Sequence, residues 1–266
     1  MKILFFGDIV GKIGRGAIKK VLPQLKKELE PDLVMANVEN LAHGKGVTKK
    51  TLREVKDAGI DIFTSGNHIW KQNEVFEIFQ EKDCMLLRPA NYPPNVPGKG
   101  YKIFEVGTRS ILVVNLIGRV FFKDEFDCPF RKIDEILKEF EKKKNLSGII
   151  VDFHAEATSE KVAFGWYVDG RVSVVLGTHT HIPTADGQIL PQGTAYITDV
   201  GMVGAKESVI GVQKEIIIQN FLTQIGKSHE IPKQGICTVN AVLVEIDPET
   251  KRAIDIKRID REVEIR

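Results

Sequence analysis

The sequence is poor in cysteine and lacks long apolar runs. Its three cysteines, Cys84, Cys128 and Cys237, lie far apart and show no CxxC spacing, which argues against a disulfide framework and against a thiolate zinc site. No apolar run approaches the roughly 18 residues that span a bilayer, and the first run, ILFF, is too short for the core of a signal peptide. We therefore expect a soluble cytoplasmic protein with reduced cysteines and no membrane partner.

A strong excess of charge of either sign is also absent. The 38 basic and 36 acidic residues leave a formal net charge of +2, which gives no generic electrostatic footprint for duplex nucleic acid. With 42% hydrophobic and 28% charged residues, the composition is that of an ordinary globular protein. We expect a single domain over residues 1–266. The sequence leaves the oligomeric state open, so a homo-oligomer is compatible with it.

Apolar, strand-like runs alternate with segments of helical spacing in the first part of the chain. The runs KILFF, LVMAN and IDIF are separated by such segments, and this alternation is typical of βαβ units. Residues 88–100 hold four prolines and two glycines and predict a loop. After residue 170 the chain becomes strand-rich, with TVNAVLVEI and AIDIKRI as a closing hairpin. We predict an α/β fold of the four-layer α+β type, in which two packed mixed β-sheets are flanked by helices.

Five of the apolar runs are followed by residues that can hold a metal ion. Open sheets flanked by helices bind ligands outside the carboxyl ends of their strands, so these side chains are expected to meet at one edge. The candidates, in chain order, are Asp8, Glu39 with Asn40, Asn67 with His68, His154, and His179 with His181.

Each candidate also has a purely structural interpretation. Asp8 could cap the helix that follows it, SGNH could be a polar turn, and a single histidine such as His154 is more often a hydrogen-bonded structural residue. The segment GTHTH is the strongest local signal, because residues two apart on an extended chain face the same side. Five independent coincidences at five strand ends are less economical than one metal site.

The chemistry of the candidate ligands predicts the kind of metal. Carboxylate, amide and imidazole groups without thiolate suit Fe or Mn, or else Zn, in an octahedral or near-octahedral site. Seven ligands are too many for one ion, whereas two ions about 3.5–4 Å apart form a clamp for an in-line displacement at phosphorus. Glu39 is the candidate bridge between them. Two divalent ions exceed the charge of Asp8 and Glu39, which favours an anionic phosphoester substrate.

The ordered motifs resemble those of the calcineurin-like metallophosphoesterases. They are GD near residue 8, VEN at 38–40, GNH at 66–68, DFHAEAT at 152–158 and GTHTH at 177–181. The segments GDIVGKIGR, NVENLAHGKG and ITDVGMVG are similar to the YmdB-type branch, which is associated with 2′,3′-cyclic-nucleotide 2′-phosphodiesterase activity. The resemblance runs nearly from end to end, and it implies the metallophosphoesterase fold.

The resemblance also implies roles for the individual residues. One ion would be held by Asp8, Glu39, Asn40 and His181, and the other by Glu39, Asn67, His154 and His179. His68 would protonate the departing oxygen or stabilise its developing charge. The general superfamily pattern begins Asp-x-His, and this chain has Asp8, Ile9 and Val10 instead. The YmdB-type branch is similar in lacking that histidine and in using an Asn after the bridging Glu.

The function inferred is therefore hydrolysis of 2′,3′-cyclic nucleotides, or other small phosphodiesters, to 3′-phosphates. Two alternatives stay open, namely a regulatory metal-binding protein with incidental phosphodiesterase activity and a broad metallonuclease. The Gly44-Lys45-Gly46 segment could bring backbone amides or an ammonium group to a phosphate, or could be a simple connector. Asp186, Asp199 and His43 receive no direct role from the sequence, and His229 is expected in an exposed loop.

Overall fold

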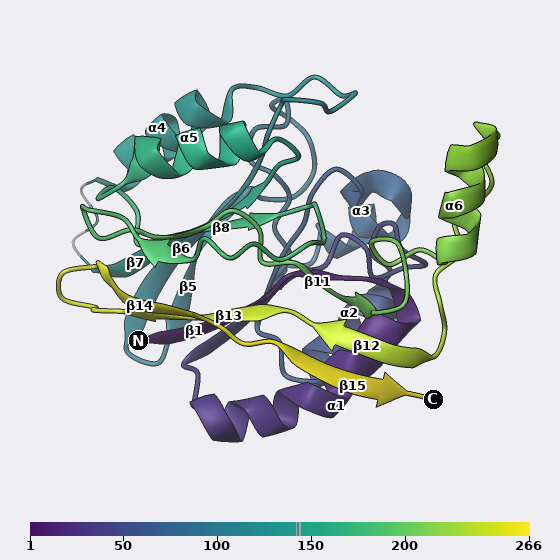
Figure 1. Cartoon of the computed structure of the whole chain (residues 1–266). Helices are drawn as coiled ribbons and strands as arrows, with labels where there is room; N and C mark the ends of the chain where they lie inside the picture. Colours follow the sequence, from purple (N-terminus) through teal and green to yellow (C-terminus); the bar gives the residue numbers. More distant parts are fainter. Residues whose placement is uncertain (142, 144) are drawn as a thin grey trace.

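Two β-sheets lie face to face in the middle of the molecule, and helices cover their outer faces (Figure 1). The computed structural model describes residues 1–266 apart from residues 142 and 144. The first sheet has the strand order β14 (Ala253–Arg258), β13 (Ala241–Ile246), β1 (Lys2–Phe6), β3 (Leu33–Asn37) and β4 (Ile62–Thr64). The second has the order β5 (Tyr101–Val106), β6 (Arg109–Ile117), β7 (Leu146–His154), β8 (Val174–Thr178), β10 (Ala195–Ile197) and β9 (Gln188–Ile189).

A third sheet of four strands continues the first. Its order is β15 (Arg261–Ile265), β12 (Gly235–Val239), β11 (Met202–Ala205) and β2 (Asp8–Ile9). Only Gly7 separates β1 from β2, and only Asn240 separates β12 from β13. The Gly7 N–H donates to the Asn240 carbonyl at 3.2 Å, so the break between β1 and β2 lies beside the break between β12 and β13. The two predicted packed sheets are thus present, and the break that divides the first of them was not visible in the sequence.

The alternation of side chains along β1 shows why the layers stack. Ile3 and Phe5 point into the core between the two sheets, where Val113 of β6 also lies. Leu4 and Phe6 point the other way, into the core beneath the helices. A strand buried on both faces needs apolar residues at every position, because successive side chains face opposite sides of the sheet. The continuous run ILFF therefore predicts a central strand, as observed.

The helices form the two outer layers. Those packed on the first sheet are α1 (Gly11–Leu29), α2 (Lys49–Asp57) and α3 (Glu74–Ile78), and a 3₁₀ turn, Ile69–Lys71, precedes α3. Helices α4 (Pro129–Phe140) and α5 (Thr158–Val168) cover the second sheet (Figure 1). Helix α6 (Lys214–Thr223) stands away from the body of the molecule and buries none of its residues (Figure 1). Within the described part of the chain, no helix combines the length and apolar character needed to cross a membrane.

Several local predictions are confirmed. The run LVMAN coincides with β3, and β13 pairs with β14 as an antiparallel hairpin in which Val244 lies opposite Ile256. Residues 88–100 contain no helix or strand of their own. Helix α1 contains Pro23 and continues through it to Leu29.

The strand directions decide where a ligand can bind. Strands β1, β3 and β4 run parallel to one another, and so do β6, β7 and β8. The carboxyl ends of β3, β4, β7 and β8 lead into the segments that carry the predicted ligands, and Asp8 follows β1 directly. The edge formed by these strand ends is therefore the place to look for the site.

Candidate metal centre

Side chains from both sheets converge on one nitrogen at this edge, His154 Nε2. Glu39, His154 and His179 offer ligand atoms that all lie within 4.8 Å of one another. The distances to His154 Nε2 are 3.0 Å from His179 Nδ1, 3.2 Å from Asn67 Oδ1 and 3.3 Å from Glu39 Oε1. Residues separated by more than a hundred positions thus present imidazole, amide and carboxylate groups to one point.

The other ring nitrogen of His154, Nδ1, is held by a hydrogen bond to Thr178. Its Nδ1 lies 2.9 Å from Thr178 Oγ1, and the Thr178 hydroxyl donates to Asp152 Oδ1 at 2.7 Å. Because the hydroxyl hydrogen points to Asp152, Nδ1 of His154 is the donor to Thr178. The chain Asp152, Thr178, His154 therefore orients the ring so that Nε2 faces Glu39, as second partners of metal-bound histidines commonly do.

Electrostatics in the cluster favour a positive charge at its centre. Burial lowers the pKa of His154, but the attraction of the Glu39 carboxylate and the hydrogen bond that the ring donates to it outweigh burial and raise that pKa to about 9. Burial opposes the ionisation of Glu39, but His154 and the hydrogen bond from the His68 N–H (3.0 Å) keep its pKa below its usual range. The cluster thus holds a proton where a metal ion would supply the same charge.

His179 is prepared as a neutral ligand. Its Nε2 lies 2.7 Å from Glu156 Oε2, and its backbone N–H donates to Asp8 Oδ2 at 3.1 Å. Burial, reinforced by the charge on His154, lowers the pKa of His179 to about 2. The neutral ring keeps its hydrogen on the nitrogen that faces Glu156, so Nδ1 has a free lone pair toward His154.

Two oxygens beside this cluster accept no hydrogen bond from the described residues, and Asp8 Oδ1 has only a long ion pair of 3.9 Å to His154 Nδ1. Asp8 Oδ1 and Asn40 Oδ1 are buried, and neither has a hydrogen-bond partner in the described part of the chain. The Asn40 amide nitrogen donates to the Gly44 carbonyl at 2.8 Å, which fixes the amide and leaves Oδ1 free. Buried acceptors without donors are costly, and a cation would satisfy both. The donor set therefore fits bound metal.

The structural interpretation of Asp8 does not hold. The N-cap of α1 is Val10, and no side chain caps that helix. Burial raises the pKa of Asp8 against the attraction of His181 and His154. The carboxylate thus faces the histidines, and a helix-capping role is excluded.

The reasoning from alternation along GTHTH is wrong. Strand β8 ends at Thr178, and His179 and His181 both have left-handed backbones, with φ of 105° and 64°. Their rings separate, since His179 meets His154 whereas His181 Nδ1 donates to the Ile210 carbonyl at 2.8 Å. A carbonyl only accepts, so Nδ1 of His181 carries the hydrogen and Nε2 stays available as a ligand. His181 does not belong to the group around His154.

Asn67 and His68 reach different neighbours, although the Asn67 amide nitrogen also lies 3.5 Å from His68 Nδ1. Asn67 points to His154, whereas His68 lines an adjoining cavity together with Asn40 and His181. Burial lowers the pKa of His68 against the attraction of Glu39, so this imidazole is neutral at pH 7. Only glycine fits at position 66, just before them. A Cβ on Gly66 would lie 2.3 Å from His154 Nε2 and 2.4 Å from Glu39 Oε2.

The Gly44-Lys45-Gly46 turn does not offer its last two amides to a ligand. The Lys45 N–H donates to the Ala42 carbonyl, and the Gly46 N–H donates to the Glu39 carbonyl. These two amides are therefore not available to a phosphate, and the approach of the Lys45 ammonium group stays a prediction. The turn instead holds Asn40 through the Gly44 carbonyl, and it places Lys45 on the wall of the cavity next to His68.

A buried ion pair behind the site was missed by the sequence reasoning. Lys161 (1% exposed) donates to Asp199 Oδ2 at 2.6 Å and to the Thr178 carbonyl at 2.8 Å. The same Asp199 oxygen accepts from the Thr180 N–H at 3.1 Å, so the pair holds the turn that carries both histidines. The available signal was the position of Lys161 on the face of α5 that also buries Phe164.

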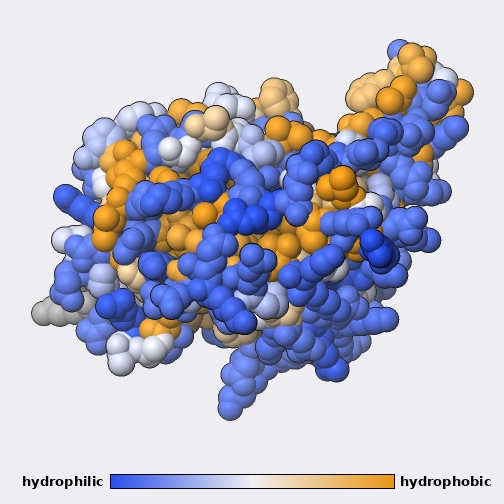
Figure 2. Space-filling model, turned by 60° about the horizontal axis from the view of Figure 1, so that its bottom comes forward, coloured by the Kyte–Doolittle hydropathy of each residue, from blue (hydrophilic) through white to orange (hydrophobic). Residues whose placement is uncertain are grey.

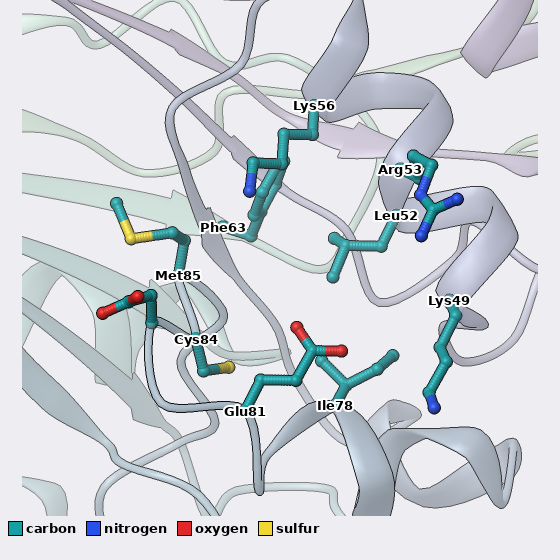
Figure 3. A pocket seen from close by; sticks show the side chains of 10 residues that line it. Lys49, Leu52, Arg53, Lys56, Phe63, Ile78, Glu81, Cys84 and Met85 are labelled. Atoms are coloured by element: carbon teal, nitrogen blue, oxygen red, sulfur yellow. The ribbon is translucent and has the colours of Figure 1, made fainter.

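A different cavity, of about 160 Å³, opens between α2 and the segment 78–85. Figure 3 shows Lys49, Arg53 and Lys56 of α2 around it, with Glu81 on the opposite side and Phe63 within. It contains no histidine. None of the predicted site residues lines this cavity.

Comparison with known proteins identifies related sequences. A family model described as "YmdB-like protein" matches residues 4–259. A 2′,3′-cyclic-nucleotide 2′-phosphodiesterase of Bacillus subtilis is 45% identical over 259 residues, which cover 97% of this chain and 96% of that protein. The name of this relative agrees with the predicted class of enzyme, a phosphoric-ester hydrolase.

Solved structures show the same architecture. A structure titled as a novel phosphatase from Mycoplasma pneumoniae is 39% identical and covers 99% of this chain and 94% of that chain, with a TM-score of 0.91. A NAD nucleotidase of Haemophilus influenzae, only 13% identical, covers 99% of this chain and 56% of that chain with a TM-score of 0.59, which concerns the fold alone. The predicted fold class is confirmed.

Proposed function

Because the chain belongs to the YmdB-like protein family, we propose that it is a metal-dependent phosphodiesterase that converts 2′,3′-cyclic nucleotides to 3′-phosphates. The observation that carries this proposal is the pair of buried, unpartnered oxygens of Asp8 and Asn40 beside the cluster of Glu39, His154 and His179. Such a set of oxygen and nitrogen donors suits a dinuclear centre of iron or manganese, or else zinc.

The proposed ligands divide into two groups that share Glu39. Asp8, Asn40 and His181 would hold one ion with it, through the free oxygens and through Nε2 of His181. Asn67, His154 and His179 would hold the other. Bound ions supply Lewis-acid activation of water and neutralise the charge of a phosphodiester. The chain's part is to hold the donor atoms in position before the ions arrive.

His68 is the proposed catalytic residue. It lies next to the ligand Asn67, and its ring faces the cavity that opens beside the centre. Its lowered pKa means that a neutral imidazole is present at pH 7, so the ring donates a hydrogen bond to the departing 2′ oxygen as charge develops there. Opening the ring on that side leaves the phosphate on the 3′ oxygen.

We expect the manganese-loaded protein to convert 2′,3′-cyclic AMP to 3′-AMP, identified by chromatography. His68→Ala is expected to lower kcat by about 10²–10³-fold, because removing one hydrogen-bond donor to a developing negative charge costs that much, while the metal content measured by mass spectrometry stays the same. The control is His43→Asn, which changes an exposed histidine whose left-handed backbone (φ 53°) asparagine also tolerates.

The outcomes separate the alternatives. A product that is mainly 2′-AMP would contradict the proposed regiochemistry. Full turnover in His68→Ala would remove that residue from the reaction. Absence of turnover despite bound metal would favour a regulatory metal-binding protein, whereas cleavage of long RNA in preference to cyclic AMP would favour a nuclease.

Metal binding is expected to depend steeply on pH. In the metal-free protein the pKa of His154 is raised to about 9, so its ring is protonated at pH 7 and must lose a proton to bind a cation. Affinity for Mn²⁺ should therefore rise by about tenfold per pH unit between pH 6 and 8, since one proton is released for each ion bound. Titration calorimetry in buffers of different ionisation enthalpy measures this proton directly, and pH-independent binding would contradict it.

A further inference from the structure

A cavity of about 430 Å³ opens directly beside the metal centre. Asn40, His68 and His181 form the wall on the side of the centre. The opposite wall comes from the loop 209–212, from α6 and from Ile231. The volume is within the range of pockets that hold small molecules. A ligand held by the metal ions would therefore place the rest of its structure in this cavity.

The outer wall of the cavity is apolar and includes an aromatic ring. Ile217 and Phe221 are four residues apart on α6 and line the cavity together, next to Ile210 and Ile231. Phe221 is 81% exposed, and α6 buries no residue of its own. In Figure 2 the lobe that projects at the upper right, where α6 lies in Figure 1, carries apolar surface. An aromatic side chain left open beside a catalytic centre indicates a ligand.

The projecting segment is anchored to the site. The Gln213 N–H donates to the Glu230 carbonyl at 2.9 Å, which joins the two ends of the segment at its base. The Ile210 carbonyl accepts from His181, so the residue that lines the cavity also fixes a proposed ligand. Gly44 packs against Ile231, since a Cβ on Gly44 would lie 2.9 Å from that side chain. The outer wall is therefore held at a defined position relative to the centre.

Two polar side chains on the same wall suit a heteroaromatic ligand. Asn220 and His229 line the cavity, and Asn220 Oδ1 accepts from the Lys227 N–H at 2.9 Å, which orients the amide. An apolar surface with a few polar groups recognises a flat, uncharged ring with hydrogen-bonding edges. The only ammonium group on the cavity wall belongs to Lys45, on the side of the centre.

We propose that this cavity binds the nucleobase of the cyclic nucleotide, with Phe221 of α6 stacking on the base and Asn220 and His229 facing its edge. This inference rests on the proposed function, because it requires a nucleotide whose phosphate lies at the metal centre. The segment 213–230 is then the part of the chain that distinguishes nucleotides from other phosphodiesters.

The test compares 2′,3′-cyclic AMP with a substrate that lacks the base, methyl β-riboside 2′,3′-cyclic phosphate, on the manganese-loaded protein. We expect the wild type to show a KM about 5–150-fold lower for cyclic AMP, because stacking of one base on an aromatic side chain is worth about 1–3 kcal/mol. Phe221→Ala should raise the KM for cyclic AMP and bring the KM ratio closer to one, with the contacts to Asn220 and His229 remaining. Leu222→Ala, the matched control on the adjacent exposed residue (72%), should keep the wild-type ratio.

Several results would overturn the inference. Equal KM values for the two substrates in the wild type would mean that the base makes no contact, while the phosphodiesterase function would stand. The base site would also be refuted, with the phosphodiesterase function intact, if Phe221→Ala raised the KM values for both substrates equally. It would be refuted too if Leu222→Ala changed the ratio of the two KM values as Phe221→Ala does. Hydrolysis of neither substrate would refute the proposed function, and the base site with it.

Discussion

Replacing Glu39 with Gln is expected to lower kcat/KM for the cyclic nucleotide by about 1,000-fold and to reduce the bound metal. The Glu39 carboxylate is 1% exposed and lies between His154 Nε2 at 3.3 Å and the His68 N–H at 3.0 Å. Glutamine keeps the shape and can still accept from the His68 N–H. It removes the negative charge that a ligand shared by two cations must supply, and it turns one oxygen into an NH₂ donor.

Kinetics and metal analysis by mass spectrometry on the same samples measure both effects of Glu39→Gln. The matched control is Glu249→Gln, in the exposed turn between β13 and β14, which should bind metal and turn over as the wild type does. If Glu39→Gln keeps its metal and its activity, Glu39 is only a hydrogen-bond acceptor in a polar core, and the proposed ligand set is wrong.

Replacing Lys161 with Met is expected to lower the free energy of unfolding by about 3–5 kcal/mol. Lys161 and Asp199 are 1% and 0% exposed, so removing the lysine leaves a buried carboxylate without its counter-charge. The Thr178 carbonyl loses a donor as well. Asp199 also accepts a hydrogen bond from the Thr180 N–H, so the turn that carries His179 and His181 should become less ordered. The affinity for metal should therefore decrease together with the free energy of unfolding.

Urea unfolding of the metal-free protein gives this free energy directly. The double variant Lys161→Met with Asp199→Asn should recover part of the loss, because it removes the unpaired charge. Lys138→Met, on an exposed position of α4, should stay within about 0.5 kcal/mol of the wild type. A loss below about 1 kcal/mol for Lys161→Met would show that water reaches the Asp199 carboxylate.

The sequence predicted the layers and the edge that carries the site because both depend on local patterns. Runs such as ILFF and LVMAN are long enough to reveal central strands, and the polar residues after them stand out against the apolar context. The parallel strand directions then bring Glu39 and His154 together. The single domain, the roles of the metal ligands and the catalytic role of His68 stay predictions.

Other features could not be predicted because they depend on tertiary contacts. The left-handed backbones of His179 and His181 are set by the hydrogen bonds around the turn, and they overrule the alternation expected for an extended chain. The burial of Lys161 depends on the position that Asp199, 38 residues further along the chain, takes in the folded protein. The break at Gly7 follows from the close approach of Gly201, whose carbonyl oxygen would lie 1.9 Å from a Cβ on Gly7. No pattern within a short window contains these partners.

The pairing of β1 with β13 affects how the chain can assemble during synthesis. β1 lies between β3 and β13, with Ile3 opposite Val244 of β13. The ribosome therefore synthesises β3 soon after β1, and β13 only much later. At about 5–20 residues per second, a ribosome needs roughly 10–50 s to travel from one strand to the other. Throughout that interval the apolar strand that leads to Asp8 has an open edge, which is a hazard for pairing with other chains. The first sheet can therefore be complete only after a delay in which the nascent protein must be kept from aggregating.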